Sequence, residues 1–215
     1  IFVFLKLAFE LSISNMNVFK NFILTLLIFL FFPFTSLSQK NLHGPSLNGK
    51  KVIYVYGGMK GHSPKESVNL FVPILEKEGA SVKVFDNFSV YEDEKLMNEA
   101  DLIIQIFTDA FTSDPRMNND QFKGLRNALV NGTGFAGWHG GLGDSSPNPL
   151  YHFIVGGDFV THPGELKEMK TAEYEVKIYD KEDYITNGIS DFKISGSEQY
   201  YMMIDPNVKV LAVSE

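Results

Sequence analysis

The stretch Gly134-Phe135-Ala136-Gly137-Trp138-His139-Gly140-Gly141 decides how the rest of the chain is interpreted. Its residues 135–138 are typical of a short buried strand, and the glycines around them predict a sharp turn. Gly137 to Gly141 has the G-x-nucleophile-x-G spacing of a nucleophile elbow, a strained strand-to-helix turn that exposes one side chain. The residue at the exposed position is His139, in place of serine or cysteine.

Strand and helix patterns alternate on the amino-terminal side of this turn. Apolar runs predict strands at 52–56, 82–85, 102–106 and 135–138. Amphipathic or capped segments predict helices after Ser63, around 92–98 and over 118–130. This alternation is typical of an α/β fold with a flavodoxin-like, doubly wound and mainly parallel sheet.

The first predicted helix carries two local signals. Ser63 and Glu66 have the spacing of a capping box, with Pro64 at the first helical position. Pro73 lies inside the same apolar stripe and predicts a kink or an early break.

The region after the elbow is less regular. Residues 147–155 predict a helix that Gly156 and Gly157 end. Residues 170–179 alternate between polar and apolar types, which favours a half-exposed strand, antiparallel and at a sheet edge. Residues 208–213 predict one more strand, and because a helix usually follows such a strand, we expect the C-terminal part of the domain to be missing.

The amino-terminal residues are typical of a secretory signal peptide. Lys20 precedes an apolar run, and Ser36 and Ser38 offer the small residues that a signal peptidase reads, so we expect cleavage after Ser38. A transmembrane anchor is the alternative, but the apolar run is shorter than the roughly 20 residues needed to span a bilayer. We therefore divide the chain into upstream residues and signal peptide (1–38), a linker (39–50) and one domain (51–215), and expect an exported protein without stable membrane insertion.

Composition excludes several classes of function. The net charge is −7, and no basic cluster offers a surface for nucleic acid. No cysteine is present, so thiol catalysis, disulfides and thiolate metal sites are absent. Neither of the two glycine-rich phosphate-binding motifs, G-x-x-x-x-G-K and G-x-G-x-x-G, follows the first strand. We therefore expect no bound nucleotide. A homo-oligomer is compatible with the sequence, which does not decide the oligomeric state.

Three histidines fall where the predicted strands end. His62 follows the first strand, His139 follows the fourth, and His162 lies on a loop beyond the elbow. Ligands of open α/β sheets bind beyond the carboxyl ends of the strands, so one crevice could collect all three. Three imidazoles suit a divalent metal, zinc first; the alternative is that each only forms ordinary hydrogen bonds, the commoner role of a loop histidine.

Two carboxylates and two aromatic residues complete the candidate site. Glu198 and Asp144 are candidates for a general base or a fourth ligand, with Glu198 preferred because it stands in an otherwise uncharged segment. The alternative roles are turn capping for Asp144 and a surface position for Glu198. Trp138 and Tyr200 could stack on a sugar ring, although core packing is the commoner role of a lone tryptophan.

A set of motifs in a fixed order resembles the ThuA-like (trehalose utilisation) family: residues 56–62, 137–141, 151–157, 159–164 and 197–201. This family is similar in fold to the class I glutamine amidotransferases, whose elbow normally carries cysteine. With His139 in that position, thiol-dependent glutamine hydrolysis is not available. The resemblance implies a role in carbohydrate utilisation, around keto-glycosides and disaccharides, and implies use of His62, His139, His162 and Glu198.

Two functions from different classes follow from these observations. The first is a metal-assisted hydrolase or lyase acting on keto-glycosides or trehalose derivatives, with Glu198, His139 and Asp144 as catalytic candidates. The second is a non-catalytic carbohydrate-binding or accessory protein that uses the same crevice. A serine hydrolase is weakened because no serine stands at the elbow.

Overall fold

The computed structural model of the protein describes residues 46–108, 116–163 and 172–215. The predicted signal peptide and most of the predicted linker lie outside these residues. None of the helices within the described ranges is long and apolar enough to span a bilayer.

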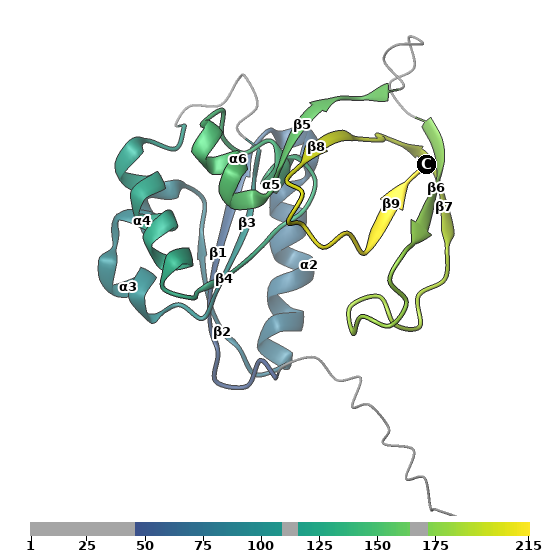
Figure 1. Cartoon of the computed structure of the whole chain (residues 1–215). Helices are drawn as coiled ribbons and strands as arrows, with labels where there is room; N and C mark the ends of the chain where they lie inside the picture. The colour runs from purple at the N-terminus through teal and green to yellow at the C-terminus, as the bar shows by residue number, and fades with distance from the viewer. Residues whose placement is uncertain (1–45, 109–115, 164–171) are drawn as a thin grey trace, which may run out of the picture. The chain divides into compact units, whose positions relative to one another are not determined.

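A four-stranded parallel sheet forms the centre of the α/β region (Figure 1). Its strands are β1 (Lys51–Gly58), β2 (Ser81–Phe85), β3 (Leu102–Thr108) and β4 (Gly134–Ala136). Their order is β2-β1-β3-β4, which is the flavodoxin-like arrangement with the first and third strands adjacent. The predicted doubly wound α/β class is confirmed. The first three strands cover their predicted runs, whereas β4 ends at Ala136, two residues before the predicted end, because the turn to α5 already begins at Gly137.

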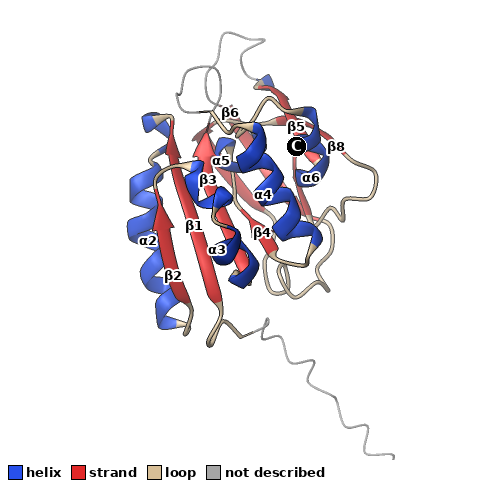
Figure 2. Ribbon diagram, turned by 90° about the vertical axis from the view of Figure 1, so that its left-hand side faces the viewer, coloured by secondary structure: helices blue, strands red, loops and turns tan. Residues whose placement is uncertain are grey.

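Helices cover both faces of this sheet (Figure 2). On one face, α2 (Pro64–Lys77) packs Val68 against residues of β1 and β3 such as Tyr54 and Ile104. The other face is covered by the short helix η2 (Phe88–Glu92), α3 (Glu94–Glu99), α4 (Asn119–Val130) and α6 (Pro149–Val155). Successive residues of a strand point to opposite faces of the sheet. Because helices cover both faces, β1 and β3 have apolar residues on both sides and are continuous apolar runs in the sequence.

For the first helix, the predicted capping box and the predicted early break are wrong. Ser63 precedes α2 but has a left-handed backbone (φ 51°) and makes no side-chain capping hydrogen bond, whereas side-chain caps normally need an extended backbone. The helix also does not break at Pro73, since it runs unbroken to Lys77 with its apolar side against the sheet. The capping box is found instead at α4, where Asn118 and Gln121 satisfy each other's backbone amides.

The C-terminal part of the described chain is antiparallel. After α5 (Gly140–Gly143) and α6, β5 (Gly157–Thr161) pairs with β8 (Tyr201–Ile204). A three-stranded sheet has the order β7-β6-β9, with β6 (Ala172–Ile178) between β7 (Phe192–Ser197) and β9 (Ala212–Ser214). The antiparallel prediction for 170–179 is confirmed but the edge position is wrong, because partners pair with β6 on both sides. The last strand begins at Ala212, after a turn closed by the Val208 amide on the Asp205 carbonyl.

Candidate metal and active site

His139 occupies a strained strand-to-helix turn, as the elbow spacing predicted. Its backbone has φ 54° and ψ −152°, and in the described ranges Ser63 is the one other non-glycine residue with a left-handed φ. A Cβ at Gly137 would lie 2.4 Å from the Gln105 carbonyl oxygen, and one at Gly141 would lie 2.7 Å from the Ile106 Cα. Both glycines are therefore needed for α5 to approach β3 closely, and the approach presents His139 at the end of the sheet.

The structure brings two predicted histidines and the preferred carboxylate together. The His62 and His139 rings meet edge to face with centroids 4.6 Å apart. His139 Nε2 lies 3.2 Å from Glu198 Oε2. One donor atom from each of His62, His139 and Glu198 lies within 4.8 Å of the other two, which is an arrangement that could hold a divalent cation.

His162 lies at the edge of this group, and the same carboxylate links it to the others. Its Nε2 is 4.0 Å from Glu198 Oε2, and its Nδ1 lies 3.2 Å from the Gln199 carbonyl oxygen. A carbonyl only accepts hydrogen bonds, so Nδ1 carries the hydrogen, and in the neutral form of the ring Nε2 is an acceptor that faces the Glu198 oxygen. Two acceptors facing each other favour a cation, a proton or a donor between them.

Thr108 orients the remaining histidine. It ends β3 directly beside Gly58 of β1, and its side-chain oxygen lies 2.8 Å from His62 Nδ1. This contact occupies His62 Nδ1, so Nε2 is the nitrogen that we assign to the group. The sequence analysis missed Thr108, since nothing in an apolar strand marks its last threonine as the partner of a distant histidine.

Aromatic side chains flank the histidines. Trp138 is 39% exposed and packs on Phe71 with ring centroids 4.6 Å apart, so it does not belong to the core. The ring centroid of Tyr200 lies 4.6 Å from that of His139 and 4.9 Å from that of His162. Burial, and then the charges of Glu198 and Asp144, raise the pKa of Tyr200, so its hydroxyl remains a proton donor.

A cavity of about 510 Å³ opens on this group and is lined by His62, Trp138, His139 and Glu198 among others. The volume is in the range of small-molecule sites. Asp144, the other candidate base, is not part of the three-residue group within the described chain. Its charge contributes to the raised pKa of Tyr200. His152 lies elsewhere, 3.2 Å from Asp158.

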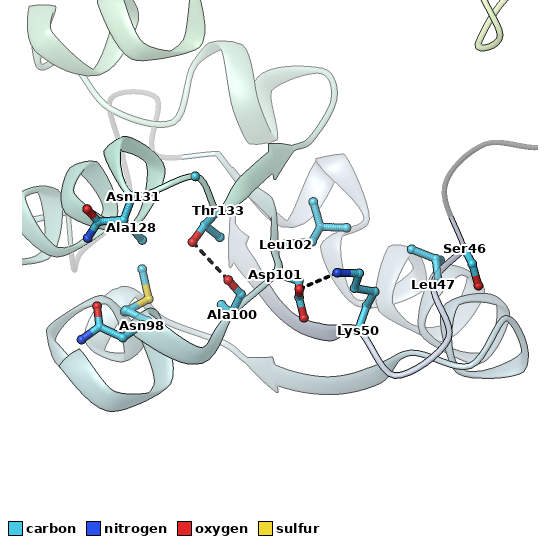
Figure 3. A pocket seen from close by; sticks show the side chains of 12 residues that line it. Ser46, Leu47, Lys50, Asn98, Ala100, Asp101, Leu102, Ala128, Asn131 and Thr133 are labelled. Atoms are coloured by element: carbon cyan, nitrogen blue, oxygen red, sulfur yellow. Dashed lines mark hydrogen bonds and ion pairs between the residues drawn. The ribbon is translucent and has the colours of Figure 1, made fainter.

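Another pocket, of about 430 Å³, lies at the end of the sheet where the strands β1, β3 and β4 begin (Figure 3). Lys50 and Asp101 face each other there with Nζ and Oδ1 2.8 Å apart. The Thr133 hydroxyl donates to the Ala100 carbonyl at 3.1 Å. These polar groups satisfy one another at the end of the sheet where ligands of this fold seldom bind, so the histidine cavity is the candidate site.

The electrostatics of the group predict a pH-dependent stability. Burial first, and the neighbouring His62 second, lower the pKa of His139, while Glu198 opposes the shift. Below the unfolded pKa of about 6.5, the unfolded chain therefore binds more protons at this residue than the folded chain. We expect the metal-free protein to be most stable above that pH and to lose stability as the pH falls through it.

Urea unfolding at a series of pH values between about 7.5 and 5.5 measures this slope. The His139→Gln variant, which cannot titrate, should show a flatter dependence than the unmodified chain. An unchanged slope in that variant would mean that His139 titrates normally in the folded protein.

Comparisons with known proteins agree with the fold and the motifs. A model of the ThuA family, described as trehalose utilisation, matches residues 51–215. The crystal structure of a ThuA-like protein from Bacteroides uniformis ATCC 8492 is similar with a TM-score of 0.63 and 17% sequence identity, covering 79% of this chain and 69% of that one. At that identity the similarity concerns the fold, and a comparison with curated proteins found no significant match. Because the family model spans well over half of the sequence, the chain belongs to the ThuA (trehalose utilisation) family.

Proposed function

We propose that this trehalose-utilisation protein is an exported, metal-assisted hydrolase or lyase acting on keto-glycosides or disaccharides such as trehalose derivatives. One observation carries the proposal: two imidazoles and a carboxylate offer donor atoms within 4.8 Å of one another beside a cavity. The two imidazoles lie beyond the carboxyl ends of the parallel strands β1 and β4, where α/β proteins bind their ligands, and Glu198 joins them from the segment after β7.

The donor set fits zinc. Two histidines and one glutamate are a recurring ligand set of catalytic zinc sites, which keep a further position open. His62 and His139 would supply imidazole nitrogens and Glu198 a carboxylate oxygen. When bound, a divalent ion supplies Lewis-acid polarisation of a keto or glycosidic oxygen.

The surrounding side chains then have separate roles. His162 has its Nδ1 committed to the Gln199 carbonyl, so its Nε2 is the group that accepts or returns a proton. Trp138, exposed at the cavity and backed by Phe71, offers a flat apolar face to a sugar ring. Tyr200 offers a hydroxyl that stays protonated. Glu198 thus moves from the preferred base to a ligand, and Asp144 has no part in the proposal.

A carbohydrate-binding protein without turnover is the second candidate. The exposed position of Trp138 favours it, because an exposed aromatic residue beside a cavity suits sugar recognition whether or not a reaction follows. The two candidates share the cavity and differ in whether a product forms.

The test combines metal content with turnover. Elemental analysis of protein purified without added metal should find zinc near one equivalent per chain, and 3-keto-trehalose should be cleaved. His162→Gln should keep the metal and lose turnover, since it removes only the proton-transferring group. Binding of the sugar by calorimetry without product or metal would instead support the accessory protein, and Trp138→Ala should then weaken that binding.

Thr108 gives a further prediction about the same site. Thr108→Val removes the hydroxyl that contacts His62 Nδ1 and should weaken zinc binding about tenfold, as loss of an outer hydrogen bond to a ligand does. Thr108→Ser keeps the hydroxyl and should retain the affinity. Zinc competition titrations measure both, and Thr133→Val, which loses a hydroxyl at the opposite edge of the sheet, is the matched control. Equal affinities for all three variants would contradict the role of Thr108.

A further inference from the structure

A buried polar network lies behind the elbow. At its centre is the Gln105 amide in the middle of β3, where the side chain has no exposed surface (0%). Gln105 Nε2 donates to the Ser145 hydroxyl and to the Tyr151 hydroxyl, each at 2.7 Å, and Oε1 accepts from the Tyr91 hydroxyl at 2.6 Å. A buried polar group costs stability unless it is fully bonded, and this amide is bonded at both of its atoms.

The hydrogen bonds of this network can run in only one direction. The Ser145 hydroxyl donates to the Phe107 carbonyl, and the Tyr151 hydroxyl donates to the Leu142 carbonyl at 2.9 Å. Both hydroxyls use their hydrogen on a carbonyl, so Gln105 must present its NH₂ group to them and its oxygen to Tyr91. Burial also raises the pKa of Tyr151, which keeps its hydroxyl protonated.

Leu142 connects the network to the candidate site. Its amide and that of Gly143 both donate to the His139 carbonyl, at 3.1 and 2.9 Å. The helix α5 is a single turn, which has little stability of its own, and the carbonyl groups at its end lack helical partners. Tyr151 supplies the partner for one of them.

The geometry points to Tyr151 as the positioning residue of His139, with Gln105 fixing Tyr151 in turn. Tyr151 lies on α6 and does not line the cavity, so it acts through the backbone of α5. Its hydrogen bond holds the turn in which His139 keeps its left-handed backbone beside His62 and Glu198. The inference rests on the proposed function only in treating His139 as a ligand.

The chain offers a matched pair of variants to test this. Tyr151→Phe removes the hydroxyl that bonds Leu142, and Tyr91→Phe removes the hydroxyl on the other side of the same amide. Both tyrosines are buried, at 0% and 1% exposure. Tyr91→Phe loses the hydrogen bond to Gln105 Oε1, whereas Tyr151→Phe loses two, one to the Leu142 carbonyl and one from Gln105 Nε2. Urea unfolding should show that both variants are less stable than the unmodified chain, with the larger loss for Tyr151→Phe.

Only Tyr151→Phe should loosen the turn at His139 and α5, because only this variant loses the hydrogen bond to the Leu142 carbonyl. Amide hydrogen exchange at Leu142, Gly143 and Asp144 should become about fivefold faster, which corresponds to roughly 1 kcal/mol for one hydrogen bond. Zinc affinity should fall about tenfold, as for other supporting residues of metal ligands. Tyr91→Phe should leave both the exchange at these three amides and the zinc affinity unchanged.

The two readouts separate this inference from the proposed function. Equal effects of the two variants on exchange at 142–144, or no effect of Tyr151→Phe, would overturn the positioning role. An unmodified chain that binds no zinc would overturn the metal proposal, while the exchange comparison would still decide the role of Tyr151.

Discussion

Replacing His139 with alanine is expected to remove both the bound metal and the turnover. The imidazole of His139 touches every other member of the group: His62 at 4.6 Å between ring centroids and Glu198 at 3.2 Å between Nε2 and Oε2. Without it, one imidazole and one carboxylate remain, which is too few ligands for a stable zinc site. Elemental analysis should find less than a tenth of the metal of the unmodified protein, and product formation should fall to background.

Two further variants control this result. His139→Gly loses the same ligand but relieves the left-handed backbone, so it should be about 1 kcal/mol more stable than the alanine variant in urea unfolding. His152→Ala removes a histidine that lies outside the group and should keep the full metal content. Stoichiometric metal in the His139→Ala protein would refute the proposed site.

Replacing Glu198 with glutamine is expected to have the second largest effect. The change keeps the size of the side chain and removes the charge that faces His139 and His162. An amide oxygen is a much weaker zinc ligand than a carboxylate, so zinc affinity should fall by more than about 100-fold, beyond what outer residues cost. Competition with a chromogenic chelator measures this change directly.

This variant also separates the two roles considered for Glu198. If Glu198 only moved a proton, the glutamine variant would bind zinc as well as the unmodified protein and would lack turnover. Glu173→Gln, which neutralises an exposed carboxylate of β6, is the control and should change neither property. Zinc binding at full strength by Glu198→Gln would return Glu198 to the role of base.

Much of the fold could be predicted because local patterns and tertiary structure agree in the parallel sheet. The apolar runs at 52–56 and 102–106 are buried on both faces, so no other element accommodates them as well. The errors arose where packing overrides a local signal. Pro73 stays within α2 because the helix packs along the sheet. The strand predicted at 170–179 is not at an edge, because β9 pairs with β6 on the side opposite β7.

The candidate site was predicted less completely. His62 and His139 were assigned to one crevice because parallel strands end at the same edge of the sheet. The supporting residues Thr108, Gln105 and Tyr151 were missed, since each looks like an ordinary strand or helix residue. Their roles depend on hydrogen bonds between segments far apart in the chain.

The sequence by itself determined the α/β class, the family and the strained turn at His139, because strand runs, glycine spacing and ordered motifs are local properties of the chain. Only the tertiary structure decided which groups share the cavity. Glu198 reaches His139 because the segment between β7 and β8 lies beside the elbow, and no periodicity records that approach. The physical reason is that side chains a few ångströms apart in a site are positioned by strand pairing and buried hydrogen bonds, which join residues without any fixed spacing in the sequence.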